Sequence, residues 1–390
     1  MKTKSRVLEL DVIRAIAVLM VIIFHYTARF DELYGPFKNN ITWFKHGGVH
    51  LFFIFSGYLI YSSLLSSKNE LEFITKRILR LYPGYWVCLI TSYTIISIFG
   101  LPGREVSFMD FILNFSMMQY MLGVYSVDGV YWSLFYQLTF YFFMAASFRF
   151  IKSKYQHVFF ISWLGLFILN STVIRENMIN ILFSLHYSML FLGGIYFSRL
   201  NKDKSLINIL MPFITFVCFI SFVNEPLDLA QVAIIGVSYL LIYAYAFQRL
   251  NLKLLAPIAL LAPISFEWYL LHQNIGFIML RYLYAHVWEH PVMILIPMTV
   301  TAGMAWVIYT YVGQPAAKYL TGKLIHQPGK LPPVIQPGNR VMEIPELLPS
   351  SSPMQIREFI PGNDPEINSS RKGIRDEEIS GVHDSIKTPV

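Results

Sequence analysis

The chain has 390 residues, of which 55% are hydrophobic and only 14% are charged, and its net charge is +7. Soluble domains carry about 25% charged residues, so the composition excludes a large soluble core and indicates a polytopic membrane protein. The positive residues lie in short loops rather than in a basic run, so no nucleic-acid partner is expected. The two cysteines, Cys88 and Cys218, lie in apolar runs and indicate neither a disulfide framework nor a metal cage.

Apolar segments recur along most of the chain, and most of them have about the 20 residues that a helix needs to cross the hydrocarbon core. We therefore predict an all-α fold of about ten transmembrane helices, at residues 11–30, 47–67, 84–100, 130–150, 157–174, 181–198, 206–223, 230–247, 258–280 and 292–312.

The distribution of Lys and Arg predicts the orientation of these helices, because cytoplasmic loops are enriched in both. One side has sixteen: Lys2, Lys4, Arg6, Arg14, Lys68, Lys76, Arg77, Arg80, Arg149, Lys152, Lys154, Arg199, Lys202, Lys204, Arg249 and Lys253. The other side has six: Arg29, Lys38, Lys45, Arg104, Arg175 and Arg281. Both termini are therefore expected in the cytoplasm, in a multi-pass protein of the inner (plasma) membrane.

The ends and connections are predicted from composition. The basic N-terminus and first apolar run resemble a signal peptide, but the run contains charged and titratable residues and lacks a small-x-small cleavage site, so an uncleaved helix is expected. Residues 68–82 have helical apolar spacing, which predicts an amphipathic helix on the inner face. Within the outer connection 101–129, an apolar stretch predicts a re-entrant or interfacial helix. The membrane domain is expected at residues 1–322, followed by a Pro/Ser-rich cytoplasmic tail, predicted to be disordered, at 323–390.

The first span contains Arg14 and His25, and ionisable residues inside a spanning helix mark a functional site by default. Eleven residues make almost three helical turns, so both side chains lie on one face, about 16 Å apart along the axis. The structural alternative is an arginine that reaches the headgroups and a histidine satisfied within the bundle.

Other polar residues have weaker signals. Arg77 and Arg80 share a helix face and suit phosphate, but they could equally anchor that helix to anionic lipids. His46 and His50 have the spacing of a metal pair, yet Gly47 and Gly48 argue against a rigid helix there, so no metal is expected.

Two later spans also place polar groups within the membrane. Trp132, Ser133 and Gln137 gather at the outer mouth of the fourth span. Glu267 and His272 lie in the ninth span and should face the bundle interior. His186 stands alone among apolar residues and is interpreted as a core histidine. These patterns are compatible with transfer chemistry or with transport.

Taken together, the segments resemble the acyltransferase 3 family of integral-membrane O-acyltransferases. The resemblance lies in LELDVIRAIAVLMVIIFHY, GGVHLFFIFSGYLI, the Arg-x-x-Arg of Arg77 and Arg80 before LYPGYW, YWSLFYQLTFY, MLFLGGIYFSRL and ISFEWYLLHQNI. It covers roughly residues 6–320, with six blocks in the family's order.

The resemblance implies transfer of an acyl group, usually acetyl, from cytoplasmic acyl-CoA to hydroxyls of an extracytoplasmic glycan or lipid-linked glycan. It implies that Arg14, Arg77 and Arg80 bind the CoA phosphates and that His25 is the general base or a transient acyl carrier. Trp132 and Ser133 would shape the pocket, together with Gln137 and His50.

The sequence departs from the family's pattern at three positions: His50 replaces an Asp, and Gln137 and Gln314 each replace a Glu. We therefore predict Glu267 to be a relocated catalytic carboxylate, acting with His25 and His272. Two alternatives are an exporter or flippase of glycan intermediates on the same fold, and a non-catalytic subunit of a polysaccharide synthase complex.

Overall fold

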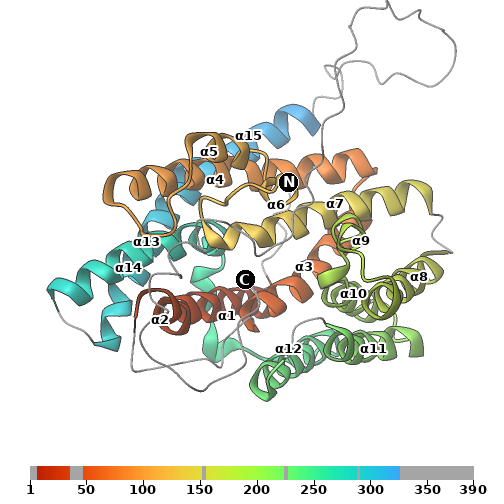
Figure 1. The fold of residues 1–390 in the computed structure, drawn as a ribbon. Helices are drawn as coiled ribbons and strands as arrows, with labels where there is room; N and C mark the ends of the chain where they lie inside the picture. Colours follow the sequence, from red (N-terminus) through yellow and green to blue (C-terminus); the bar gives the residue numbers. More distant parts are fainter. Residues whose placement is uncertain (1–6, 36–46, 152–154, 224–226, 288–289, 326–390) are drawn as a thin grey trace, which may run out of the picture. The chain divides into compact units, whose positions relative to one another are not determined.

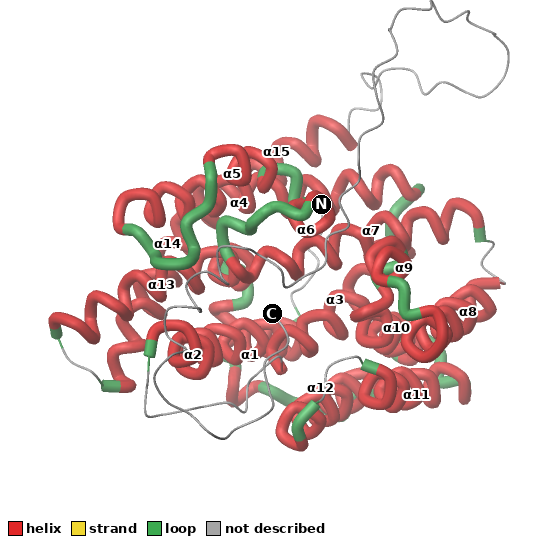
Figure 2. Tube along the Cα trace, viewed as in Figure 1, coloured by secondary structure: helices red, strands yellow, loops and turns green. Residues whose placement is uncertain are grey.

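The computed structural model describes residues 7–35, 47–151, 155–223, 227–287 and 290–325. They form helices and loops without a strand, as Figure 2 shows, so the predicted all-α class is confirmed. The tail predicted from residue 323 lies outside the described residues beyond Ile325, where the last helix ends.

The α-helices of the described residues are α1 (Leu8–Phe24), α2 (Phe30–Tyr34), α3 (Gly47–Leu65), α4 (Glu70–Phe99), α5 (Phe108–Asn114), α6 (Gln119–Leu122), α7 (Trp132–Phe150), α8 (Gln156–Leu169), α9 (Asn177–Leu182), α10 (Leu185–Leu200), α11 (Leu206–Phe222), α12 (Leu229–Ala246), α13 (Ser265–His286), α14 (Leu295–Ile308) and α15 (Gln314–Ile325). Short 3-10 turns are η3 (Gly129–Tyr131), η6 (Lys253–Leu255), η7 (Ile258–Leu261) and η8 (Pro291–Ile294), and π-helical turns are η1 (His25–Arg29), η5 (Asn170–Ile174) and η9 (Tyr309–Gly313).

Six helical segments are long and apolar enough to cross a membrane: Gly47–Leu65, Glu70–Phe99, Gln156–Ile174, Asn177–Leu200, Leu229–Ala246 and Pro291–Ile325. This supports a multi-pass membrane protein, whereas the count of ten and the sides of the termini stay predictions. The helices at the first, fourth, seventh and ninth predicted spans (α1, α7, α11 and α13) are not among the six. Helices α1 and α11 have only 17 residues each, whereas α7 and α13 contain buried polar side chains.

Two predicted helix boundaries are wrong. The amphipathic helix at 68–82 and the span at 84–100 form one helix, α4, with Pro83 inside it. At 1.5 Å per residue, its 30 residues extend about 45 Å, longer than the hydrocarbon core of about 30 Å. The ninth span begins at Ser265 rather than at 258, because Pro263 lacks the N–H that a continuous helix would need there.

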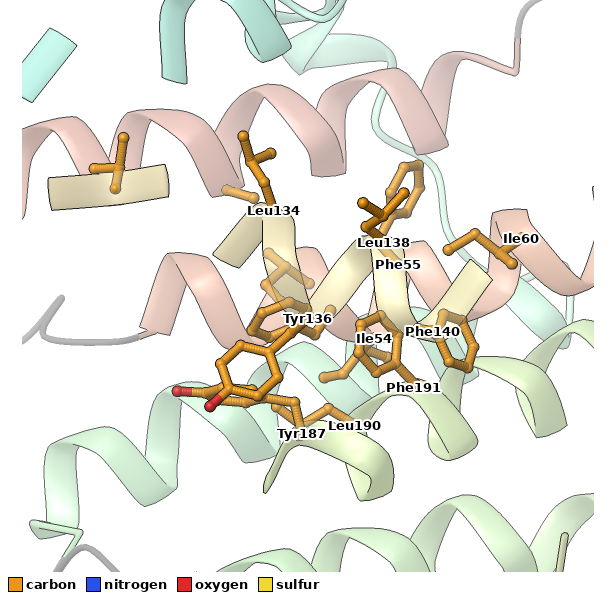
Figure 3. Packing of buried hydrophobic residues seen from close by; sticks show 14 of the residues in the cluster. Ile54, Phe55, Ile60, Leu134, Tyr136, Leu138, Phe140, Tyr187, Leu190 and Phe191 are labelled. Atoms are coloured by element: carbon orange, nitrogen blue, oxygen red, sulfur yellow. The ribbon is translucent and has the colours of Figure 1, made fainter. Parts of the chain in front are cut away.

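The core of the bundle is the pair α3 and α10, which pack extensively against each other. Gly57 of α3 lies against the carbonyl of Phe191, and Gly194 of α10 lies against the carbonyl of Ile54, so a side chain at either glycine would overlap the facing backbone. Small residues allow this close approach of helices in membranes. Helix α7 adds Phe140, which stacks on Phe191 at 4.0 Å between ring centroids (Figure 3).

The other helices surround this pair. Figure 1 shows α11 and α12 together on one side of the bundle, next to α10, and α4 with α15 on the opposite side. Helix α1 packs against both α3 and α13. Large apolar side chains such as Phe99, Leu229 and Leu240 are exposed, while His272 and Asn274 are buried. This distribution is typical of helices that face lipid and keep their polar residues inside the bundle.

Candidate active site

His25 and His272 meet where α1 contacts α13. His25 opens the π-helical turn η1, and π-turns occur frequently at functional sites. His272 lies in the middle of α13 and is fully buried. Nδ1 of His25 lies 3.1 Å from Nε2 of His272, and the ring centroids are 4.9 Å apart. The structure thus joins two predicted site residues that are 247 positions apart in the sequence.

The hydrogen bonds around the two rings fix their tautomers. Nδ1 of His272 donates to the carbonyl of Tyr269 at 2.8 Å, because a carbonyl can only accept. Nε2 of a neutral His272 is then an acceptor. Nδ1 of His25 donates to the carbonyl of Val21 at 2.9 Å and shares that proton with Nε2 of His272. A neutral His25 therefore carries its lone pair on Nε2, which is the form of a general base.

Tyr26, the residue after His25, locks η1 onto α13. Its hydroxyl donates to the carbonyl of His272 at 2.7 Å and lies 3.4 Å from the hydroxyl oxygen of Thr301 on α14. Its ring packs directly on Gly276, where any side chain would overlap it. Thr301 is held in turn by Trp268, whose indole N–H donates to it at 3.0 Å. Three helices thus fix the backbone on both sides of the histidine pair.

A cavity extends along α1 and reaches Val21 and Tyr269, whose carbonyls bond His25 and His272. Its walls are mostly apolar, and about 430 Å³ of space lies within its outline, part of which is open solvent. Arg14, Ala17, Val18 and Val21 of α1, Gly48, Val49 and Phe52 of α3, Leu134 of α7, and Ser265, Phe266 and Tyr269 of α13 line it. The α1 residues are the helix face that joins Arg14 to His25. Sequence spacing predicted that face, but not the cavity beside it.

The three predicted phosphate-binding arginines have different surroundings. Arg14 lines the cavity, with its guanidinium 5.3 Å from the centroid of the Phe55 ring. Arg77 is held inside the bundle, over the rings of Phe73 and Tyr141 and with Nη2 3.4 Å from the carbonyl of Leu59. Arg80 is exposed. Arg80 and Arg14 are therefore more accessible to an incoming ligand than Arg77 is.

Of the predicted pocket residues, Ser133 contacts a residue that lines the cavity. Its hydroxyl oxygen is 2.7 Å from that of Tyr269, which lines the cavity. Trp132 packs against Phe53 and Tyr187, and Gln137 donates to the hydroxyl of Tyr141 at 2.7 Å.

His50 packs on the ring of Phe219 of α11. Together with Trp132 and Gln137, it is absent from the cavity wall. Of the four predicted pocket residues, the structure therefore connects Ser133 alone to the cavity, through Tyr269.

Glu267 is buried, but its carboxylate does not contact His25 or His272. It faces α4 and η9, where a Cβ at Gly84 or Gly313 would lie 2.9 or 2.7 Å from Oε1. Glu267 and His272 are five positions apart, which places them on different faces of α13. The carboxylate lies beside the residue that precedes Gln314, one of the departures from the family's pattern. Its catalytic role stays a prediction.

Sequence reasoning missed a second polar cluster, in the connection before α7. The Asp128 carboxylate is fully buried and accepts the backbone N–H groups of Asn274 at 3.0 Å and Val130 at 3.2 Å. Arg104 donates to the side-chain oxygen of Asn274 at 3.3 Å. Burial raises the pKa of Asp128 to about 6, although these hydrogen bonds and Arg104 act in the opposite direction. The cluster anchors α13 two residues beyond His272.

Comparison with known families defines the class of this protein. The family model described as an acyltransferase domain, that of the acyltransferase 3 family, matches residues 7–312. The chain belongs to this family and is an acyltransferase.

Individual relatives match over shorter stretches. The O-acetyltransferase OatA of Staphylococcus aureus (strain NCTC 8325 / PS 47) is 37% identical over 95 residues, which are 22% of this chain and 14% of the relative. The O-acetyl transferase of Shigella phage Sf6 is 34% identical over 86 residues, 21% of this chain and 25% of the relative. The chain therefore spans only a small part of the length of either relative. No solved structure matches the chain.

Proposed function

We propose that this chain is a membrane O-acetyltransferase that takes an acetyl group from acetyl-CoA on the cytoplasmic side of the inner membrane. The acceptor is a hydroxyl of a cell-envelope or secreted glycan, free or lipid-linked. Family membership supports acyl transfer, and the names of the two relatives support O-acetyl transfer. Membership also supports an enzyme over an exporter or a non-catalytic subunit.

The observation that carries the proposal is the continuous face from Arg14 to His25. Arg14 stands at one end of the cavity, and Val21, whose carbonyl orients His25, lies in its wall. The length of this face, about 16 Å, suits a ligand that is charged at one end and apolar along its length. The phosphates of CoA would bind Arg14 and Arg80, while the pantetheine arm and its thioester occupy the cavity.

His25 then acts as the general base. Its Nε2 accepts the proton of the acceptor hydroxyl, whose oxygen attacks the thioester carbonyl carbon. The tetrahedral intermediate collapses with cleavage of the C–S bond, and the imidazolium returns the proton to the CoA sulfur. Each step balances without a metal. His272 orients His25 by accepting part of its Nδ1 proton, so it is a positioning residue.

The test uses inside-out membrane vesicles that carry the full chain and enclose the envelope glycan fraction of the host in their lumen, with radiolabelled acetyl-CoA supplied outside. We expect label in the glycan with wild type and a loss of about 100-fold or more with His25→Gln, because general-base catalysis contributes about 10²–10⁴ in rate. His186→Gln, which changes a histidine of α10 packed among aromatic rings, should retain activity. Absence of labelled glycan with wild type would refute the function, and equal activity of His25→Gln would refute the role of His25.

A further inference from the structure

Two hydroxyl groups and one carbonyl form a triangle between α7 and α13. The hydroxyl oxygens of Ser133 and Tyr269 are 2.7 Å apart. Each also lies within hydrogen-bond distance of the carbonyl oxygen of Val130, at 3.1 Å from Ser133 and 3.0 Å from Tyr269. Three oxygen atoms are thus in mutual contact, with two hydroxyl protons between them.

This triangle has one more contact than it has protons. Either hydroxyl can donate to the carbonyl of Val130, and the other then donates to its neighbouring hydroxyl. If Ser133 donates its hydrogen bond to the carbonyl of Val130, the hydroxyl of Tyr269 can donate to another acceptor. The buried carbonyl of Val130 then still has a partner. The Tyr269 hydroxyl is therefore a hydrogen-bond donor that can be released at little cost.

Tyr269 lies between the cavity and the histidine pair. Its side chain lines the cavity and stacks parallel to the ring of Phe52, another wall residue, with centroids 6.3 Å apart. Its ring centroid is 5.8 Å from that of His272, and its backbone carbonyl holds Nδ1 of His272. Tyr269 keeps some accessible surface, whereas Ser133 is buried, so the tyrosine is the member of the pair that a ligand can reach.

We propose that Tyr269 is a further catalytic residue, whose hydroxyl donates a hydrogen bond to the thioester carbonyl oxygen as that oxygen becomes negative. This inference rests on the proposed function. When the acceptor oxygen attacks, its proton passes to Nε2 of His25 and the electron pair of the C=O bond moves to oxygen. Tyr269 stabilises this oxyanion without losing its proton. Collapse restores the C=O bond and expels the CoA sulfur, which takes the proton from His25.

Tyr269→Phe tests the proposal because it keeps the ring that stacks on Phe52 and removes only the hydroxyl. Loss of one oxyanion donor lowers kcat by about 10²–10³-fold. We expect kcat for acetyl transfer to fall by about 100-fold and the KM for acetyl-CoA to change less than threefold. Tyr239→Phe is the matched control, since Tyr239 of α12 is buried and its hydroxyl contacts Thr215 instead. It should keep wild-type kcat and KM.

A second measurement separates a catalytic from a structural hydroxyl. A fluorinated tyrosine incorporated at position 269, more acidic but still protonated at the assay pH, should raise kcat relative to tyrosine because it is a stronger donor. A structural hydroxyl would leave kcat unchanged. If Tyr269→Phe keeps a third or more of wild-type kcat, or kcat is insensitive to fluorination, the inference is overturned while the proposed function stands. If wild type transfers no acetyl group, the proposed function and the inference both fall.

Discussion

Gly276 is the position at which a single methyl group tests the geometry of the histidine pair. A Cβ at this site would overlap Cε1, Cζ and the hydroxyl oxygen of Tyr26, well inside the 3.4 Å at which ordinary contact begins. Tyr26 cannot move aside easily, because its ring is fully buried and its hydroxyl is bonded to the carbonyl of His272. Gly276→Ala must therefore push η1 and α13 apart.

The expected effect is larger on activity than on stability. A separation of about 1 Å would break the 3.1 Å contact between His25 and His272, and a misplacement of that size costs about 100-fold in rate. Overpacking of a core costs about 1–3 kcal/mol, so the protein should still fold. We expect kcat for acetyl transfer to fall by about 100-fold, and the thermal unfolding midpoint in detergent to fall by a few degrees.

The control is a glycine with open space around it. At Gly303 of α14, none of the described atoms beyond its own turn of helix lies within 4 Å of the position of a Cβ, so Gly303→Ala should leave kcat unchanged and be neutral or stabilising. Retention of more than a third of wild-type kcat by Gly276→Ala would refute the idea that close packing of η1 on α13 positions the base.

Two further predictions concern the ends of the site. Arg14→Gln should raise the KM for acetyl-CoA by about 10–100-fold with a smaller change in kcat, because a charge-assisted hydrogen bond contributes about 1.5–3 kcal/mol; an unchanged KM in the vesicle assay would exclude a phosphate contact. Because burial raises the pKa of Asp128 from 3.8 to about 6, the folded state favours the protonated carboxyl and loses stability as pH rises through this interval. Between pH 5 and pH 7, the free energy of unfolding of wild type should thus fall by about 1–2 kcal/mol relative to that of Asp128→Asn. If the difference between the two unfolding midpoints stays constant over this pH range, the prediction is wrong.

The sequence predicts much of the fold, because helical segments in a membrane protein reveal themselves by length and apolarity. The sequence predicts the ends of a helix less well where the helix has a charged part followed by an apolar part. The apolar spacing of residues 68–82 predicts a separate amphipathic helix on the inner face. The structure continues the helix through Pro83, since a proline removes one hydrogen bond from a helix that its neighbours otherwise hold in place.

The candidate site is only partly visible in the sequence. Spacing alone placed Arg14 and His25 on one face, because that relation is local to a helix. His25 and His272 are 247 positions apart in the sequence, and Ser133 and Tyr269 are 136 positions apart. A periodic pattern describes only residues within one helix, so it cannot predict such contacts. The buried Asp128 escaped notice because an acidic residue in a connecting loop is ordinarily solvated, and only the fold brings it to the backbone of α13.

These long-range contacts connect α13 to both other helices of the site. Helix α13 packs against α1 and against η3, the turn that leads into α7, so its His272 meets His25 and its Tyr269 meets Ser133. The backbone supplies the remaining partners: carbonyls of Val21, Tyr269 and Val130 accept from His25, His272 and the hydroxyl pair. Since carbonyls only accept, Nδ1 of His25 and Nδ1 of His272 are both donors toward the protein, which leaves Nε2 of His25 as the basic atom of the pair. Buried polar groups need hydrogen-bond partners, and the hydrogen bonds that His25 makes for this reason also fix the tautomer in which it can act as a base.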